Sequence, residues 1–109
     1  VVVRHNDHSV TADRTKKEGG KGKGFTATGL LMSALASAST QALKEAGKKL
    51  ALDDVHVGIT QTGPASFERR IELKGNLSAS EESTLRSAAK DTDVERMLGN
   101  VTIVDVDAL

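Results

Sequence analysis

The sequence has no cysteine, no tryptophan and no tyrosine, and it contains only one proline and two phenylalanines. The lack of cysteine excludes disulfides, thiolate chemistry and zinc–thiolate sites within these 109 residues. With so few aromatic rings, the core must be built from Leu, Val, Ile and Ala. A chain of this length forms one domain with a modest core. We therefore expect a homodimer, because an interface supplies further burial.

Net charge is absent as well, since 15 Lys and Arg residues balance 15 Asp and Glu residues. This balance gives no indication of nucleic acid or an anionic membrane as a partner. The run 24–43 carries no charge, and its length fits a membrane span. Seven of its residues are Thr, Ser or Gln, however, which favours a buried helix of a soluble domain. The start VVVRHND shows no secretory signal, so we expect a cytoplasmic protein without a membrane segment.

The pattern of apolar residues predicts an α+β fold, in which an antiparallel sheet packs against a long central helix. We expect a single domain over residues 1–109. Its elements are predicted in the following order: a hairpin over 1–12 with its turn at Asn6-Asp7, a loop over 13–24, a helix over 25–50, strands over 53–60 and 67–75, helices over 78–90 and 92–98, and a strand over 101–106.

The helix over 25–50 organises this prediction, and we expect it to be buried for most of its length. Apolar residues recur at helical spacing along one face. Thr26 or Thr28 can cap its start, and Gly47 is expected to end it. The predicted inward face consists of Leu31, Leu35, Ala38, Ala42, Ala46 and Leu50, widened by Leu30, Ala34 and Leu43.

Two later features concern polar residues near the predicted core. Capping boxes are predicted at Ser78-x-x-Glu81 and at Thr92-x-x-Glu95. In the strand over 67–75, Arg69 falls on the inward face. A buried guanidinium needs a partner, so we interpret Arg69 as part of a salt bridge, with a ligand contact in a pocket as the alternative.

Several familiar sites are excluded or disfavoured by spacing. The glycines of the loop over 13–24 match neither a Walker loop nor G-x-G-x-x-G, so we interpret it as a solvated, mobile linker. His5 and His8 have a spacing used by some metal sites, but we interpret them as exposed turn residues and expect no metal. The serines at 33, 37 and 39 lie in the predicted helix without a nucleophile elbow.

Several strings, in their order and spacing, resemble the OsmC/Ohr family of organic-hydroperoxide-reducing proteins. The resemblance runs from about Asp13 to the last strand. Its strings are Gly19-Gly20, GLLMSALASAST over 29–40, FERRIELKGNLSASE over 67–81, AAKDTDVERML over 88–98, and the closing VTIVDV.

This resemblance implies an intertwined α+β homodimer whose central helix carries a reactive cysteine in a string like LASC. Here the string is LASA, and the matching residue is Ala38. A resolving cysteine is matched by Thr92, and a glutamate that holds a catalytic arginine is matched by Thr28 or Gly29. Arg4 is the candidate for that arginine. Because both cysteines and the glutamate are missing together, the family reaction cannot run through these residues.

We therefore expect a dimeric, non-catalytic OsmC-like protein without a cofactor. Ala38, Thr92, Arg69 and Gly29 are the candidate pocket residues for a small apolar molecule between the subunits. The alternative is a stress-response enzyme of the hydroperoxide reductase type that acts through other residues or through a partner's thiol. A structural or interaction protein is the third alternative.

Overall fold

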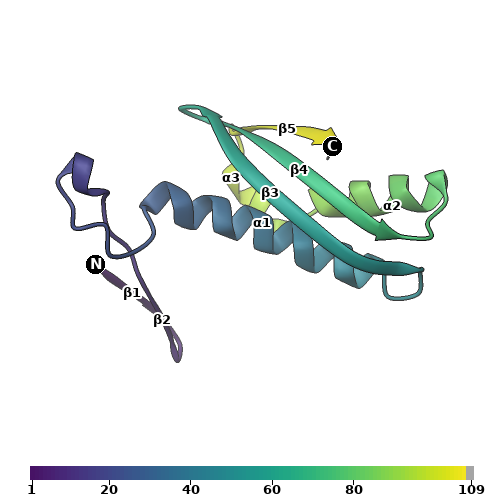
Figure 1. The fold of residues 1–109 in the computed structure, drawn as a ribbon, viewed down its shortest axis with the longest axis horizontal. Coiled ribbons are helices and arrows are strands. Elements are labelled where there is room, and N and C mark those ends of the chain that lie inside the picture. Colours follow the sequence, from purple (N-terminus) through teal and green to yellow (C-terminus); the bar gives the residue numbers. More distant parts are fainter. Residues whose placement is uncertain (108–109) are drawn as a thin grey trace. The chain divides into compact units, whose positions relative to one another are not determined.

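The computed structural model describes residues 1–107 (Figure 1). Its elements follow the order β1–β2–η1–α1–β3–β4–α2–α3–β5, and the α+β class with a long helix is confirmed. The chain divides into two compact units, residues 1–33 and the part from Ala34 onward. Helix α1, Ala27–Ala46, begins in the first unit and ends in the second. The helices in the described part of the chain lack the combined length and hydropathy of a membrane span.

The first unit contains the predicted hairpin. Strand β1, Val2–His5, pairs antiparallel with β2, His8–Thr11, so the turn consists of Asn6 and Asp7. Asn6 has φ of 55°, a left-handed conformation that asparagine tolerates better than most residues. This turn chemistry explains why the chain reverses where the sequence predicts it.

The loop after the hairpin is largely exposed, as predicted for a linker, but a carboxylate organises it. Asp13 Oδ2 accepts hydrogen bonds from the backbone N–H groups of Lys21 at 3.1 Å and Lys23 at 3.4 Å. Its Oδ1 accepts from the N–H of Arg14 at 2.8 Å. These bonds lower the pKa of Asp13, the amides of Lys21 and Lys23 having the largest effect. The loop also contains one short 3₁₀ turn, η1, Lys16–Glu18.

Helix α1 starts where the sequence predicts, because Thr26 Oγ1 accepts a hydrogen bond from the N–H of Gly29 at 2.9 Å. The prediction that it is buried for most of its length is wrong. Within the helix only Leu35, Ser39 and Leu43 are buried. These residues recur every fourth position, so the buried stripe is narrow. Leu30, Leu31 and Met32, which are also apolar, are only half-buried.

The second unit contains a three-stranded mixed sheet. Strand β3, Leu52–Gly63, pairs antiparallel with β4, Ser66–Gly75, as predicted. Strand β5, Thr102–Asp107, lies on the other side of β4 and runs parallel to it. The expectation of a purely antiparallel sheet is therefore wrong for β5. The helices α2, Ala79–Lys90, and α3, Asp93–Leu98, lie between β4 and β5 and give the crossover that a parallel pair requires.

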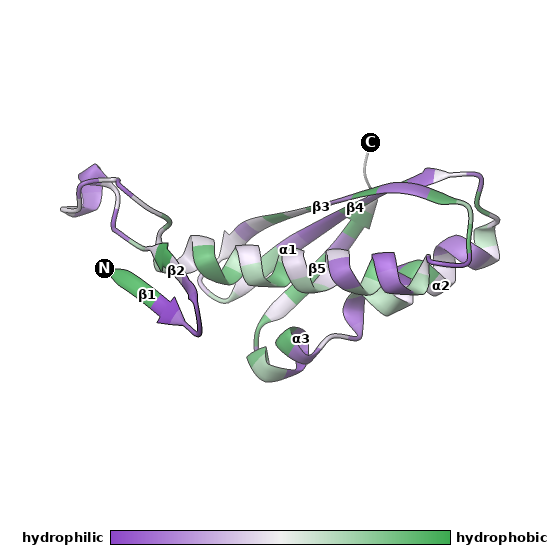
Figure 2. Cartoon of the chain, turned by 90° about the horizontal axis from the view of Figure 1, so that it is seen from below, coloured by the Kyte–Doolittle hydropathy of each residue, from purple (hydrophilic) through white to green (hydrophobic). Residues whose placement is uncertain are grey.

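The core of this unit lies between one face of the sheet and the helices α1 and α2 (Figures 1 and 2). It is aliphatic, as the composition predicts. The predicted capping box at Ser78 and Glu81 is present at the start of α2, where it satisfies two backbone N–H groups. The buried cluster consists of Leu43, Val55, Ile71, Leu85 and Ala89.

Candidate functional site

Arg69 is the largest fully buried side chain of the described chain, with 0% of its surface exposed. It lies on the inward face of β4 between Phe67 and Ile71, both of which are buried. The alternation of the strand predicts this position. A charge held among apolar neighbours must be balanced by nearby partners, because an unpaired buried ion is strongly unfavourable.

The first partner comes from the neighbouring strand. The parallel register places Asp105 of β5 opposite Arg69. Arg69 Nε donates to Asp105 Oδ1 at 2.6 Å, and Nη2 donates to Oδ2 at 2.9 Å. This bidentate geometry is the strongest interaction that an arginine and a carboxylate form. It connects β4 to β5 through side chains as well as through the backbone.

The second partner comes from α3. Arg69 Nη1 donates to Glu95 Oε1 at 2.6 Å. Thr92 caps α3, since its Oγ1 accepts from the N–H of Glu95 at 3.2 Å. The predicted capping box is thus only half formed. The Glu95 side chain does not turn back to the cap, because the buried guanidinium is a stronger partner than a backbone amide.

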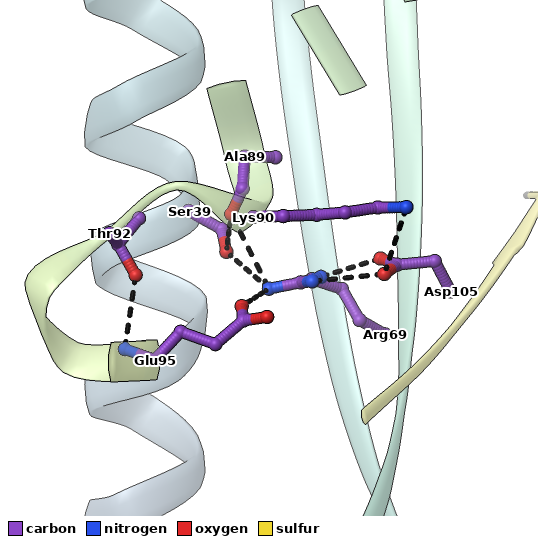
Figure 3. A network of polar contacts seen from close by, with 7 residues as sticks. All are labelled: Ser39, Arg69, Ala89, Lys90, Thr92, Glu95 and Asp105. Atoms are coloured by element: carbon purple, nitrogen blue, oxygen red, sulfur yellow. Dashed lines mark hydrogen bonds and ion pairs between the residues drawn. The ribbon is translucent and has the colours of Figure 1, made fainter. Parts of the chain in front are cut away.

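Helices α1 and α2 complete the group, which we call the Arg69 network (Figure 3). Ser39 Oγ donates to the carbonyl oxygen of Ala89 at 2.9 Å and accepts from Arg69 Nη1 at 3.1 Å. Lys90 Nζ lies 3.8 Å from Asp105 Oδ2. One guanidinium therefore joins α1, α2, α3, β4 and β5.

The electrostatics of the Arg69 network are balanced internally. Burial acts to lower the pKa of Arg69, but the hydrogen bonds and charges of Asp105 and Glu95 outweigh it and hold that pKa above its usual value. Within the described residues, no buried side-chain nitrogen or oxygen lacks a hydrogen-bond partner. The salt-bridge interpretation of Arg69 is thus the one that the structure supports.

Three of the four candidate pocket residues lie at or next to this network. Arg69 forms it, Thr92 caps the helix that carries Glu95, and Ala38 precedes Ser39 on α1. Ala38 is half-buried and Thr92 is buried. Gly29 lies in the first turn of α1 and belongs to the other unit.

Two hollows in the second unit are lined by other residues. One of about 280 Å³ lies where α1 ends and β3 begins, between Lys44 and Val55. A smaller one of about 70 Å³ lies beside Asp105 and Lys90. Ala38 and Thr92 line neither of these two.

Asp105 and Glu95 are the participants whose role the sequence does not reveal. The spacing Thr92-x-x-Glu95 is a local signal for Glu95, but it predicts that Glu95 caps the helix. Asp105 lies between Val104 and Val106 on the same face of the strand as Ile103, which is a signal for a buried pair with Arg69. This signal can be interpreted only when it is known that β5 lies beside β4.

Among the described residues, no group of three or more His, Cys, Asp or Glu side chains could hold a metal ion.

Comparison with known proteins identifies the fold. No family model and no curated protein matches the sequence. Solved structures do match. A Psychrobacter arcticus protein described as osmotic stress induced and of the detoxification response has a TM-score of 0.80 at 15% identity, covering 99% of this chain and 93% of its own. An OsmC-like protein from Mycoplasma pneumoniae has a TM-score of 0.79 at 18% identity, covering 99% and 86%.

A third similar structure is an organic hydroperoxide resistance protein from Vibrio cholerae, with captopril bound in one of its active sites. Its TM-score is 0.69 at 20% identity, and the match covers 99% of this chain and 84% of that protein. These similarities confirm the resemblance at the level of the fold. The chain has the OsmC/Ohr fold and carries no cysteine.

Proposed function

We propose that the chain is a divergent, cysteine-less member of the OsmC/Ohr family that binds a small apolar molecule and does not reduce hydroperoxides. One observation carries this proposal: Ala38 and Thr92 stand at the positions matched to the reactive and resolving cysteines. Thiol peroxidases act by attack of a thiolate on the O–O bond. A methyl group cannot do so, and a hydroxyl is not oxidised and regenerated in that way.

The hydrogen bonds around these positions favour a structural role for the neighbouring polar groups. The Thr92 hydroxyl accepts the bond that caps α3. The Ser39 hydroxyl donates its proton to a carbonyl and accepts from Arg69, so the hydroxyl is not hydrogen-bonded to a base that could activate it. A side chain held in this way stabilises one geometry and gives a ligand little opportunity to compete for it.

We further propose that one OsmC-like domain over residues 1–109 is completed by a second copy of the chain. The narrow buried stripe of α1 supports this, because Leu30, Leu31 and Met32 are only half-buried within one copy. Charge supports it too. The unit 1–33 has six basic and three acidic side chains, whereas the rest has nine basic and twelve acidic. Net charges of +3 and −3 favour contact between unlike units of two copies.

The ligand site is proposed at the dimer interface, with Ala38, Thr92, Arg69 and Gly29 as its positions. Ala38 presents a methyl group where the family has a thiol, so that wall becomes apolar. Arg69, paired within its network, would hold Ser39, the residue next to Ala38, in place. The Vibrio cholerae protein of similar fold has captopril bound in one of its active sites, which supports the proposal of a small-molecule site here. We propose a cytoplasmic location.

Two measurements test this function. Light scattering at micromolar concentration is expected to give the mass of a dimer, and a clean monomer would contradict the shared site. A panel of small apolar molecules is then screened for a rise in melting temperature. A true ligand at 100 times its Kd stabilises the fold by about 2.7 kcal/mol.

A matched pair of variants locates the site. Ala38→Gln puts a longer polar side chain into the proposed wall and should abolish the rise in melting temperature. Ala46→Gln makes the same change at an exposed position near the end of α1 and should leave it intact. No shift with any compound, or an equal loss in both variants, would count against ligand binding at Ala38.

A further inference from the structure

The tip of the β1–β2 hairpin carries two histidines that the function above does not use. His5 is the last residue of β1 and His8 is the first of β2. The register pairs them directly across the two strands. Residues paired in this way project to the same face of the sheet, with Cβ atoms roughly 4.5–5.5 Å apart. The two imidazoles are therefore neighbours on one face.

Both imidazoles are available for a ligand. His5 and His8 are exposed, and neither ring forms a hydrogen bond or ion pair in the part of the chain that the structure describes. Figure 2 shows that β1 changes from hydrophobic at its start to hydrophilic at its end. The remaining histidine, His56, differs because its Nε2 lies 3.1 Å from Asp54 Oδ2. Only the hairpin pair offers two unpartnered rings side by side.

The turn holds this pair in place. A two-residue loop is the shortest connection between antiparallel strands, and it fixes their register. Asn6 takes the left-handed conformation that this loop requires. Beyond the histidines, the pairs Arg4–Ser9 and Val3–Val10 continue the ladder. Because the backbone already sets the spacing of the rings, a ligand that bridges them loses little additional entropy on binding.

We propose that His5 and His8 form a binding site for a divalent transition-metal cation, with Cu²⁺ the preferred ion. Imidazole nitrogen suits copper, nickel and zinc, and affinity for such ligands is highest for Cu²⁺ among the first-row divalent ions. The described residues hold no group of three or more metal-ligating side chains. The remaining coordination positions would thus be open to water or to an external ligand, and the site is of moderate affinity and accessible.

The test is a titration of the whole chain with Cu²⁺ in the presence of glycine, which competes for weakly bound copper. Calorimetry gives the affinity, and electron paramagnetic resonance reports the nitrogen ligands through their hyperfine pattern. The parent chain is expected to bind one Cu²⁺ through a pair of imidazole nitrogens. His5→Gln and His8→Gln are each expected to weaken binding by roughly tenfold or more, because the second contact is then no longer intramolecular.

The decisive control keeps the number of histidines and changes their face. In the double variant His8→Gln/Ser9→His, the second imidazole moves one residue along β2 and projects to the opposite side. This variant should bind Cu²⁺ as weakly as His8→Gln alone. His56→Gln should bind as the parent does. If the double variant kept the parent affinity, or if His5→Gln and His8→Gln changed neither the affinity nor the nitrogen pattern, the proposed site would be wrong.

Discussion

Replacing Arg69 by methionine is expected to destabilise the fold severely, although methionine suits an apolar strand face. The substitution leaves Asp105 and Glu95 without the guanidinium, whose nitrogens lie 2.6 Å from one oxygen of each carboxylate. Ser39 retains its bond to the Ala89 carbonyl, so the loss falls on the two carboxylates. Breaking a buried ion pair by removing one partner typically costs about 3–5 kcal/mol.

The expected value lies at the lower end of that range. The side chains of Glu95 and Asp105 are 25% and 23% exposed, so water partly replaces the lost partner. Lys90 also remains 3.8 Å from Asp105. We expect a loss of about 3 kcal/mol, a large fraction of the roughly 5–15 kcal/mol that stabilises a typical domain. With a slope of about 1.5 kcal/mol per molar urea, the unfolding midpoint should fall by about 2 M.

Urea unfolding followed by far-ultraviolet circular dichroism measures this change, since the chain has no tryptophan or tyrosine to report by fluorescence. The protein concentration must be the same for all variants, because association would add to the apparent stability. Arg70→Met is the matched control. Its side chain is 47% exposed and lies 3.6 Å from Glu68, so its loss should stay within about 0.5 kcal/mol. Equal midpoints for the two variants would refute a stabilising role for the Arg69 network.

Three further outcomes follow from individual contacts. Asp105→Asn should lower the free energy of unfolding more than Glu95→Gln does, because Asp105 accepts from Arg69 with both oxygens and Glu95 with one. Urea midpoints in the reverse order would contradict this. Thr92→Val removes the cap of α3 and should lower the free energy of unfolding by about 1 kcal/mol in the same assay. An unchanged urea midpoint would show that the cap is dispensable. The lowered pKa of Asp13 means that its bonds persist above the ordinary aspartate pKa of about 3.9 and are lost as pH falls through the lowered value. The amide resonance of Lys21 should report this transition by NMR, and a midpoint above about 3.9 would contradict the assignment.

Local chemistry accounts for what the sequence predicts correctly. The turn at Asn6-Asp7, the capping box at Ser78 and the alternation through Arg69 each depend on residues close together in the chain. The same reasoning fails where a distant partner decides. Glu95 is three residues after a capping threonine, yet its carboxylate goes to Arg69, which is 26 residues away in sequence.

The direction of β5 and the exposure of α1 could not be predicted for a related reason. The parallel pairing of β5 with β4 depends on how α2 and α3 return the chain, which periodicity does not reveal. The uncharged run over 24–43 indicates burial, but it does not say which molecule supplies the cover. The half-buried Ala38 therefore remains the position at which the proposed dimer and ligand site are to be tested.

The most direct test of the account is the consumption of an organic hydroperoxide, such as cumene hydroperoxide, with a dithiol as reductant. Ala38→Cys/Thr92→Cys is the matched variant, because it places thiols at the two positions matched to the family cysteines. The account predicts that the unmodified chain consumes peroxide no faster than the protein-free blank. Sustained turnover by the unmodified chain above that blank would contradict the non-catalytic function.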